Sequence, residues 1–342
     1  MECDVLIIGS GPAGMSAAMH MKGFGGRVVV LERLSPRMFP RYHSVCGEAV
    51  SDRMFSKVGL EPTAVVRRVD RIEIAYPGGV TIDIPVRGSV VDRPAMLSEM
   101  KGRCDAEFLH GTATCVSQEG DGFLVETTAG PISCRFLIGA DGAHSVVRRD
   151  VFGSDPAMLP VVNNLVPGDG GSVLAFSVGE DYAGLYRWRF PSKDGFVSLG
   201  SPKGAELPEG TVVTGARHLP FGGVPETVRG NAVLVGDAAG LANALCYGGI
   251  GIGMLSGMMA AEAVKRGDLS RYSRWCRKSI YTNPHFMRAH RVFSQWTDDD
   301  IKEAMRPFRG GYSLARGFVA IVGHPRYANV YFATWMAFKL GW

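Results

Sequence analysis

The sequence predicts an α/β fold: a doubly wound, mostly parallel sheet with an antiparallel layer inserted into it and a helical C-terminal region. The chain opens with an apolar strand at residues 5–8, a glycine-rich turn, a helix reaching about Gly23 and a second apolar strand at 28–31. This order is typical of a βαβ unit, from which parallel sheets are built. At residues 72–84 the apolar residues alternate instead around Pro-Gly-Gly, which indicates an antiparallel hairpin.

The remaining elements follow from the same signals. A short helix is expected after Asp92, and an apolar strand ends at Ile138. Residues 151–229 read as a separate antiparallel sheet, with its clearest strands at 172–178, 184–190 and 195–200. A buried parallel strand follows at 232–235. The segment 238–261 has no charged residue, yet its six glycines favour a tight loop and a buried helix over a membrane span.

Length, composition and charge exclude several classes of protein. The chain has 342 residues, of which 46% are hydrophobic and 20% charged, enough for one large domain or two closely joined ones. A dispersed net charge of +4 argues against a nucleic-acid partner. The seven cysteines form no CxxC pair, which argues against a zinc site and favours a reducing cytoplasm. The N-terminus runs directly into a strand and predicts no signal peptide.

The first chemical motif is Gly-Ser-Gly-Pro-Ala-Gly at residues 9–14, between the first strand and its helix. Gly9 permits the tight turn, Gly11 lets the backbone approach a pyrophosphate, and Gly14 lets helix and strand pack closely. The positive end of the helix then faces the phosphates. Glu32 ends the second strand, where a carboxylate accepts hydrogen bonds from ribose hydroxyls. The motif predicts dinucleotide binding.

Two further motifs follow apolar strands. They are Gly-Ala-Asp-Gly-Ala-His-Ser at 139–145, which contains Asp141, and Gly-Asp-Ala-Ala-Gly at 236–240, which contains Gly236 and Asp237. Each alone is equally explained by an aspartate that caps a turn or helix. The three motifs in this order predict a cradle for a flavin dinucleotide, and hence FAD as cofactor. The fold is then a Rossmann-like FAD-binding domain with an inserted antiparallel substrate domain.

Three further segments resemble a known protein family. Cys46-Gly47-Glu48, the YxWxFP pattern at 186–191 and the continuation from 236–240 to Gly249-Ile250 resemble the geranylgeranyl reductase family. Those enzymes, including digeranylgeranylglycerophospholipid reductases, belong to a larger group of aromatic-ring-hydroxylase-like flavoproteins. The resemblance covers residues 1–267. The YxWxFP and Cys-Gly-Glu elements are fairly specific, whereas the nucleotide motifs identify only the larger group.

The resemblance and the motifs together imply site residues. The predicted cofactor-binding set is Gly9, Gly11, Pro12, Ala13, Gly14, Glu32, Arg33, Cys46, Gly47, Ala49, Arg93, Ala113, Asp141, Gly236, Asp237, Gly249 and Ile250. The predicted substrate-binding set is Tyr186, Trp188, Phe190 and Tyr247. The first three alternate along a strand and so share one face. An aromatic face suits an isoprenoid, and without the resemblance it suits a sheet core equally well.

Cys46 is the candidate catalytic residue, as a proton donor or a shaper of the substrate pocket near the flavin. The alternative is a buried cysteine that acts as a small hydrophobe. One segment departs from the family pattern: where the family reads Pro-Leu-Thr-Gly-Glu-Gly-Ile, this chain reads Ala-Leu-Cys-Tyr-Gly-Gly-Ile at 244–250. Tyr247 therefore adds bulk beside the expected flavin.

The resemblance implies an FAD-dependent oxidoreductase that reduces carbon–carbon double bonds of a geranylgeranyl or other prenyl chain. The alternatives are an FAD-dependent monooxygenase or halogenase-like enzyme, and a flavoprotein that binds a prenyl lipid without turnover. The electron donor is left open among ferredoxin, a deazaflavin and a nicotinamide. The aromatic segment 317–342 suits a membrane interface or the closing of the core, so peripheral contact with the inner face of the membrane is a hypothesis.

The expected domain organisation is discontinuous. Residues 1–70, 87–150 and 225–268 form the FAD-binding domain, 71–86 and 151–224 form the substrate domain, and 269–342 form the helical C-terminal segment.

Overall fold

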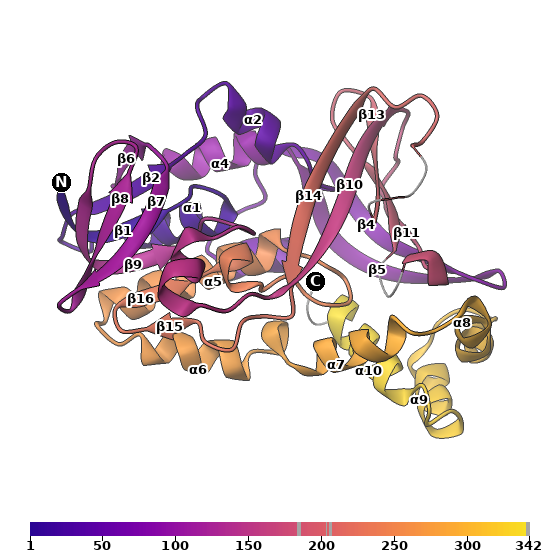
Figure 1. Ribbon diagram of the computed structural model, residues 1–342. Coiled ribbons are helices and arrows are strands. Elements are labelled where there is room, and N and C mark those ends of the chain that lie inside the picture. Colours follow the sequence, from indigo (N-terminus) through magenta and orange to yellow (C-terminus); the bar gives the residue numbers. More distant parts are fainter. Residues whose placement is uncertain (183–185, 203, 205–206, 340–342) are drawn as a thin grey trace.

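The computed structural model describes residues 1–182, 186–202, 204 and 207–339 (Figure 1). Its first sheet has the strand order β15-β16-β9-β1-β2-β6, with β8 also paired to β9 and β7 to β8. The central strands are parallel, as the βαβ signal predicts. The strands are β1 (Glu2–Ile8), β2 (Val28–Glu32), β6 (Glu107–His110), β7 (Ala113–Glu119), β8 (Gly122–Thr127), β9 (Ile132–Gly139), β15 (Val228–Arg229) and β16 (Ala232–Leu234).

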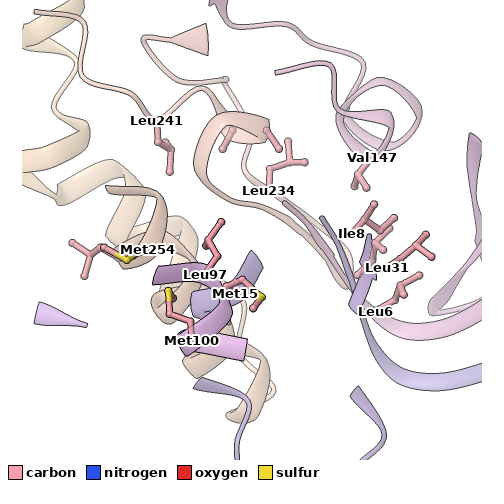
Figure 2. Packing of buried hydrophobic residues seen from close by; sticks show 14 of the residues in the cluster. Leu6, Ile8, Met15, Leu31, Leu97, Met100, Val147, Leu234, Leu241 and Met254 are labelled. Carbon is pink, nitrogen blue, oxygen red and sulfur yellow. The ribbon is translucent and has the colours of Figure 1, made fainter. Parts of the chain in front are cut away.

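Both faces of this sheet are buried, which explains its continuous apolar strands. Leu6, Ile8 and Leu31 belong to one core cluster, and Val5 and Ile7 face the opposite side in another. Figure 2 shows part of the first cluster, including Leu6, Ile8, Met15, Leu31, Leu97, Met100, Val147, Leu234, Leu241 and Met254. The surrounding helices are α1 (Pro12–His20), α3 (Asp52–Lys57), α4 (Arg93–Lys101), α5 (Ile250–Lys265) and α6 (Ser270–Lys278).

The second sheet stands beside the first and has the order β14-β10-β13-β12-β11-β4-β5-β3. It is antiparallel except for the parallel pair of β11 with β4. Its strands are β3 (Ala49–Ser51), β4 (Val65–Tyr76), β5 (Val80–Val91), β10 (Ala157–Pro167), β11 (Val173–Ser177), β12 (Arg187–Pro191), β13 (Phe196–Pro202) and β14 (Val213–Phe221). The start of the predicted strand 184–190 lies outside the described residues.

The hairpin predicted around residues 72–84 is confirmed, and it is longer than the alternating pattern indicated. β4 and β5 each have 12 residues, and their pairing is interrupted at Val65/Arg67 and Val69/Arg71. Such bulges bend a strand. With β3, these long strands place residues 49–51, 65–70 and 87–91 in the second sheet, across the predicted domain limits.

The C-terminal helices lie against the second sheet, far from the N-terminal strands (Figure 1). They are α7 (His285–Phe293), α8 (Asp298–Met305), α9 (Leu314–Gly323) and α10 (Ala328–Lys339). The uncharged segment 238–261 forms a loop and most of α5, as predicted. In the part of the chain that the structure describes, no helix is long and apolar enough to cross a membrane.

Candidate functional site

A cavity of about 480 Å³ lies between the two sheets. Every predicted site residue except Gly14 lines it, although these residues come from positions 9 to 250 of the chain. The structure therefore brings the three nucleotide motifs, the Cys46–Glu48 segment and the aromatic strand into one place. Their contact with a cofactor or substrate stays a prediction.

The glycines of the first motif have distinct positions. Gly9 has a positive φ of 98°, and a Cβ atom there would lie 2.4 Å from the Ala140 carbonyl oxygen. A Cβ on Gly14 would lie 1.9 Å from the Gly9 carbonyl oxygen, so Gly14 permits close packing and does not face the cavity. Gly11 caps α1 and borders the cavity, and the nearest atom to its Cβ position is His43 Cε1 at 3.6 Å. The cavity thus meets bare backbone at the positive end of a helix.

Glu32 has a fixed orientation. Its Oε2 accepts hydrogen bonds from the Ser10 backbone N–H (2.9 Å) and hydroxyl (2.6 Å), and its Oε1 accepts one from Leu34 N–H (2.7 Å). The carboxylate therefore ties the end of β2 to the glycine turn. It lines the cavity where the first motif predicts ribose hydroxyls.

The other two motifs each bring a carboxyl group to the cavity. Asp141 Oδ2 accepts from Val146 N–H (2.7 Å), whereas its buried Oδ1 has no hydrogen-bond partner among the described residues. Burial raises the pKa of Asp141. Asp237 lies deep in the molecule but is open to the cavity, and burial raises its pKa to about 6. A buried acceptor that lacks a partner, such as Asp141 Oδ1, suits a ligand that donates a hydroxyl hydrogen. The site therefore fits a dinucleotide.

Cationic groups gather at another part of the cavity. Arg93 Nε donates to the His43 carbonyl oxygen (2.6 Å), and Arg217 Nη2 donates to the Tyr42 carbonyl oxygen (2.6 Å). The Tyr42 ring lies 3.9 Å from the Arg217 guanidinium carbon and 5.0 Å from that of Arg33. Burial and these arginines lower the pKa of His43 to about 3, so this histidine is neutral. Such a positive surface suits phosphate groups.

Sequence reasoning did not find His43, Tyr42 or Arg217. They come from α2 (Met38–His43) and β14, and no motif joins these segments. Glu48 was part of a quoted motif, but no role was given to it.

Glu48 is a strained and buried carboxyl group at the cavity. Its side chain is 5% exposed, and its φ of 55° lies in the left-handed region, which costs a non-glycine residue about 1–3 kcal/mol. Oε1 accepts from Arg93 N–H (3.3 Å). Burial raises the pKa of Glu48 to about 7, although the Arg93 charge opposes the shift. Glu48 therefore retains a proton in many molecules near neutral pH.

The aromatic strand forms one wall of the cavity. Tyr186, Trp188 and Phe190 all line it, as the alternation of a strand predicts. The Tyr186 hydroxyl donates to the Cys246 carbonyl oxygen (2.5 Å), which joins the residue before β12 to the loop before α5. A Cβ on Gly47 would lie 2.5 Å from the Phe190 ring, so only glycine fits there. Cys46 is half-buried at the same wall.

Tyr247 occupies a position at which the chain departs from the family pattern. Its φ is 47°, so the chain keeps a left-handed backbone at the position where the family pattern has glycine. The ring packs edge-on against Tyr186 and Phe221, at centroid distances of 5.8 and 5.3 Å. The hydroxyl lies 3.2 Å from His290 Nδ1. Tyr247 therefore extends the aromatic wall at the expense of backbone strain.

A second cavity of about 300 Å³ adjoins the first. It lies between β4, β5 and β11 on one side and α7–α10 on the other, and its lining is almost entirely apolar. Phe176, Tyr186 and Phe338 line both cavities. The Phe176 ring contacts Tyr186 and Phe338 at centroid distances of 4.6 and 5.9 Å. These three rings form an aromatic partition between a polar cavity and an apolar one.

The chain is similar in sequence to several known proteins. A family model described as lycopene cyclase protein matches residues 4–157. Digeranylgeranylglycerophospholipid reductase 1 of Methanothermobacter thermautotrophicus is 29% identical, across 82% of this chain and 83% of that protein. Geranylgeranyl diphosphate reductase of Rhodobacter capsulatus is 26% identical, across 77% of this chain and 75% of that protein. Over most of its length the chain is similar to geranylgeranyl reductases.

Solved structures show the same fold. A geranylgeranyl bacteriochlorophyll reductase-like protein from Thermoplasma acidophilum superposes with a TM-score of 0.77 and 18% identity, covering 95% of this chain and 97% of that one. A probable FAD-dependent monooxygenase from Pseudomonas aeruginosa has a TM-score of 0.67 and 16% identity, covering 89% and 99%. The predicted fold class is confirmed. Because both reductases and a monooxygenase share the fold, it does not by itself select the reaction.

Proposed function

We propose that this chain binds FAD in the cavity between the sheets and reduces carbon–carbon double bonds of a prenyl chain. The observation that carries the proposal is the aromatic partition, because Phe176, Tyr186 and Phe338 line both the cavity that holds the nucleotide motifs and the apolar one. The names of the curated relatives support a prenyl substrate. A long apolar chain that reaches Tyr186 from the second cavity would meet the polar cavity there.

The residues divide the work of binding. Gly11 and the N-terminus of α1 would hold the pyrophosphate, Glu32 the ribose, and Asp141 and Asp237 further hydroxyls of the cofactor. The aromatic wall would orient the alkene and exclude water from it. When bound and reduced, FAD supplies the hydride that adds to one alkene carbon.

The second alkene carbon requires a proton. Glu48 would hold that proton, because it is buried beside the wall and its pKa is raised to about 7. Cys46, two residues away, lines the same cavity and is the alternative donor. Arg93, whose N–H donates to Glu48, would keep the carboxyl group oriented.

The test is an anaerobic reaction of dithionite-reduced holoenzyme with a geranylgeranyl phospholipid, followed by mass spectrometry of the lipid. The lipid should gain pairs of hydrogens while the flavin is re-oxidised, and a saturated phytanyl lipid should leave the flavin reduced. Glu48→Gln should slow turnover by about 100-fold if it supplies the proton, and Cys46→Ala by less than about tenfold. An unchanged lipid with every prenyl substrate would refute the proposal.

The same holoenzyme preparation distinguishes the reductase proposal from the monooxygenase alternative. With air and a nicotinamide cofactor present, a monooxygenase would consume NAD(P)H faster when its substrate is added. The reductase proposal expects no such stimulation by prenyl lipid. The physiological electron donor remains to be chosen among ferredoxin, a deazaflavin and a nicotinamide, by supplying each in place of dithionite.

A further inference from the structure

Helix α9 is the least covered apolar element of the described chain. Leu314, Phe318, Val319 and Val322 are 71, 70, 64 and 65% exposed, values unusual for large apolar side chains. The helix lies at the edge of the molecule opposite the first sheet (Figure 1). Its inner side is packed, since Ala320 is fully buried. One face of α9 therefore presents a continuous apolar strip outward.

The chain segment that contains this strip is basic. After Glu303 the sequence contains Arg306, Arg309, Arg316, Arg326 and Lys339 and no aspartate or glutamate. Arg306, Arg309 and Arg316 are exposed and carry the positive charge of the rim, whereas the exposed Arg326 is paired with Asp300 of α8 (2.8 Å). Apolar side chains rimmed by arginine and lysine are the composition by which interfacial helices bind anionic bilayers. A protein partner would need an acidic rim around an apolar groove, whereas an anionic bilayer supplies both properties over its whole surface.

The strip also borders the second cavity. Leu314, Gly317, Phe318 and Ile321 line that cavity from α9, whereas Val319 and Val322 do not. The same helix thus has two borders, one with the surroundings of the protein and one with the apolar cavity.

We infer that α9 and its arginine rim form a docking surface for an anionic lipid bilayer, with the second cavity opening beside the docked helix. The reason that docking would serve this protein rests on the proposed function, because a prenyl lipid would pass from the bilayer into the second cavity without crossing water. The docking itself requires only the exposed apolar strip and the positive rim.

The test is flotation of the full-length holoenzyme with vesicles of phosphatidylglycerol and phosphatidylcholine, and with vesicles of phosphatidylcholine alone. Wild-type protein should float with the anionic vesicles, bind the neutral ones at least tenfold more weakly, and dissociate as salt screens the charges. The double variant Val319→Asp, Val322→Asp should lose at least tenfold in binding. Arg309→Gln should weaken binding to anionic vesicles only.

The matched control is Val212→Asp, on an exposed valine (60%) that precedes β14 in the second sheet. It should bind vesicles as the wild type does. If the aspartate pair impairs folding, Val319→Ser with Val322→Ser makes the same test without charge. Failure of the wild type to float, or unchanged flotation of both double variants, would overturn the inference. So would a wild-type dimer that the double variant dissociates, because α9 would then be a self-association surface.

Turnover distinguishes this inference from the proposed function. With detergent-dispersed lipid, the Val319/Val322 variants should react as the wild type does, and with lipid in vesicles they should be slower. Vesicle binding without any turnover would count against the reductase proposal and leave the docking surface established. Turnover in detergent without vesicle binding would support the reductase proposal and overturn the docking surface.

Discussion

The two cavities differ in what builds them. The polar cavity has the aromatic wall on one side, and elsewhere it is lined by backbone at glycine turns and by carboxyl groups at or just after the ends of β2, β9 and β16. The apolar cavity is formed by side chains of β4, β5 and β11 and of four helices that follow much later in the chain. At its glycine turns the polar cavity depends on local backbone geometry, and a Cβ atom added at Gly9 or Gly14 would clash with backbone atoms. The apolar cavity depends on packing between distant elements, where side chains can shift.

Two glycines compare a backbone neighbour with a side-chain neighbour beside the polar cavity. In Gly14→Ala the new methyl group would lie 1.9 Å from the Gly9 carbonyl oxygen, which is backbone and cannot move alone. In Gly200→Ala it would lie 1.7 Å from Trp188 ring atoms, which can swing toward the adjoining cavity. We expect Gly14→Ala to destabilise the protein by more than about 3 kcal/mol and Gly200→Ala by about 1–3 kcal/mol.

Urea unfolding and the flavin absorbance of the purified variants measure both effects. Gly14→Ala should retain little flavin, whereas Gly200→Ala should keep its flavin and lose turnover of prenyl lipid. Flavin loss in Gly200→Ala with full retention in Gly14→Ala would contradict the expectation that the backbone neighbour is the stricter constraint.

Glu48 lines the polar cavity, and we expect it to make the stability of the protein depend on pH. Its pKa is raised from 4.5 to about 7 in the folded protein, mainly by burial. Arg93 and Lys193 oppose this shift and Asp92 adds to it. The folded state therefore binds the proton more tightly than the unfolded state does. Stability from this group is complete below pH 4.5, falls as the pH rises toward 7, and is constant above.

Glu48→Gln should remove this slope, so the variant should exceed the wild type above pH 7 by up to about 3 kcal/mol. The free energy of unfolding is measured in urea from pH 5 to pH 8. Asp237, with a pKa of about 6, contributes a slope of the same sign that should persist in the variant. Exposed Glu119→Gln is the control and should leave the profile unchanged. An identical profile for Glu48→Gln would show that Glu48 titrates normally.

The same contrast explains what the sequence could predict. The glycine turns, Glu32, Asp141 and Asp237 are within short motifs, and each motif follows a strand whose apolar pattern is plain. Parallel strands end at one edge of a sheet, so the motifs had to converge there. The shared face of Tyr186, Trp188 and Phe190 followed from strand alternation alone.

Other features depend on contacts that no local pattern encodes. Arg217 reaches the Tyr42 carbonyl across 175 positions of the chain, and Phe338 joins the partition from the far C-terminal helix. The left-handed backbone of Glu48 and Tyr247 could not be read from residue type, since both types normally avoid it. The family pattern did contain a signal for Tyr247, because glycine at that position indicates a positive φ.

The smallest effect compares two buried serines within the second sheet. The Ser198 hydroxyl accepts from Trp188 Nε1 (3.2 Å) and donates to Asn163 Oδ1 (2.6 Å), whereas the buried Ser89 hydroxyl has no hydrogen-bond partner among the described residues. Ser198→Ala would leave an indole N–H and an amide oxygen without their partner. We expect it to cost about 1–3 kcal/mol in urea unfolding, because a lost partner exposes the desolvation penalty of the group that remains.

Ser89→Ala should be neutral or slightly stabilising, within about 0.5 kcal/mol, because it removes a buried polar atom that gains nothing in the fold. Trp188 and Asn163 line the polar cavity, so water entering there could replace the Ser198 hydroxyl and shrink its effect toward that of Ser89. Equal costs for the two variants would therefore indicate a wet aromatic wall. A clear difference would indicate that the wall is dry.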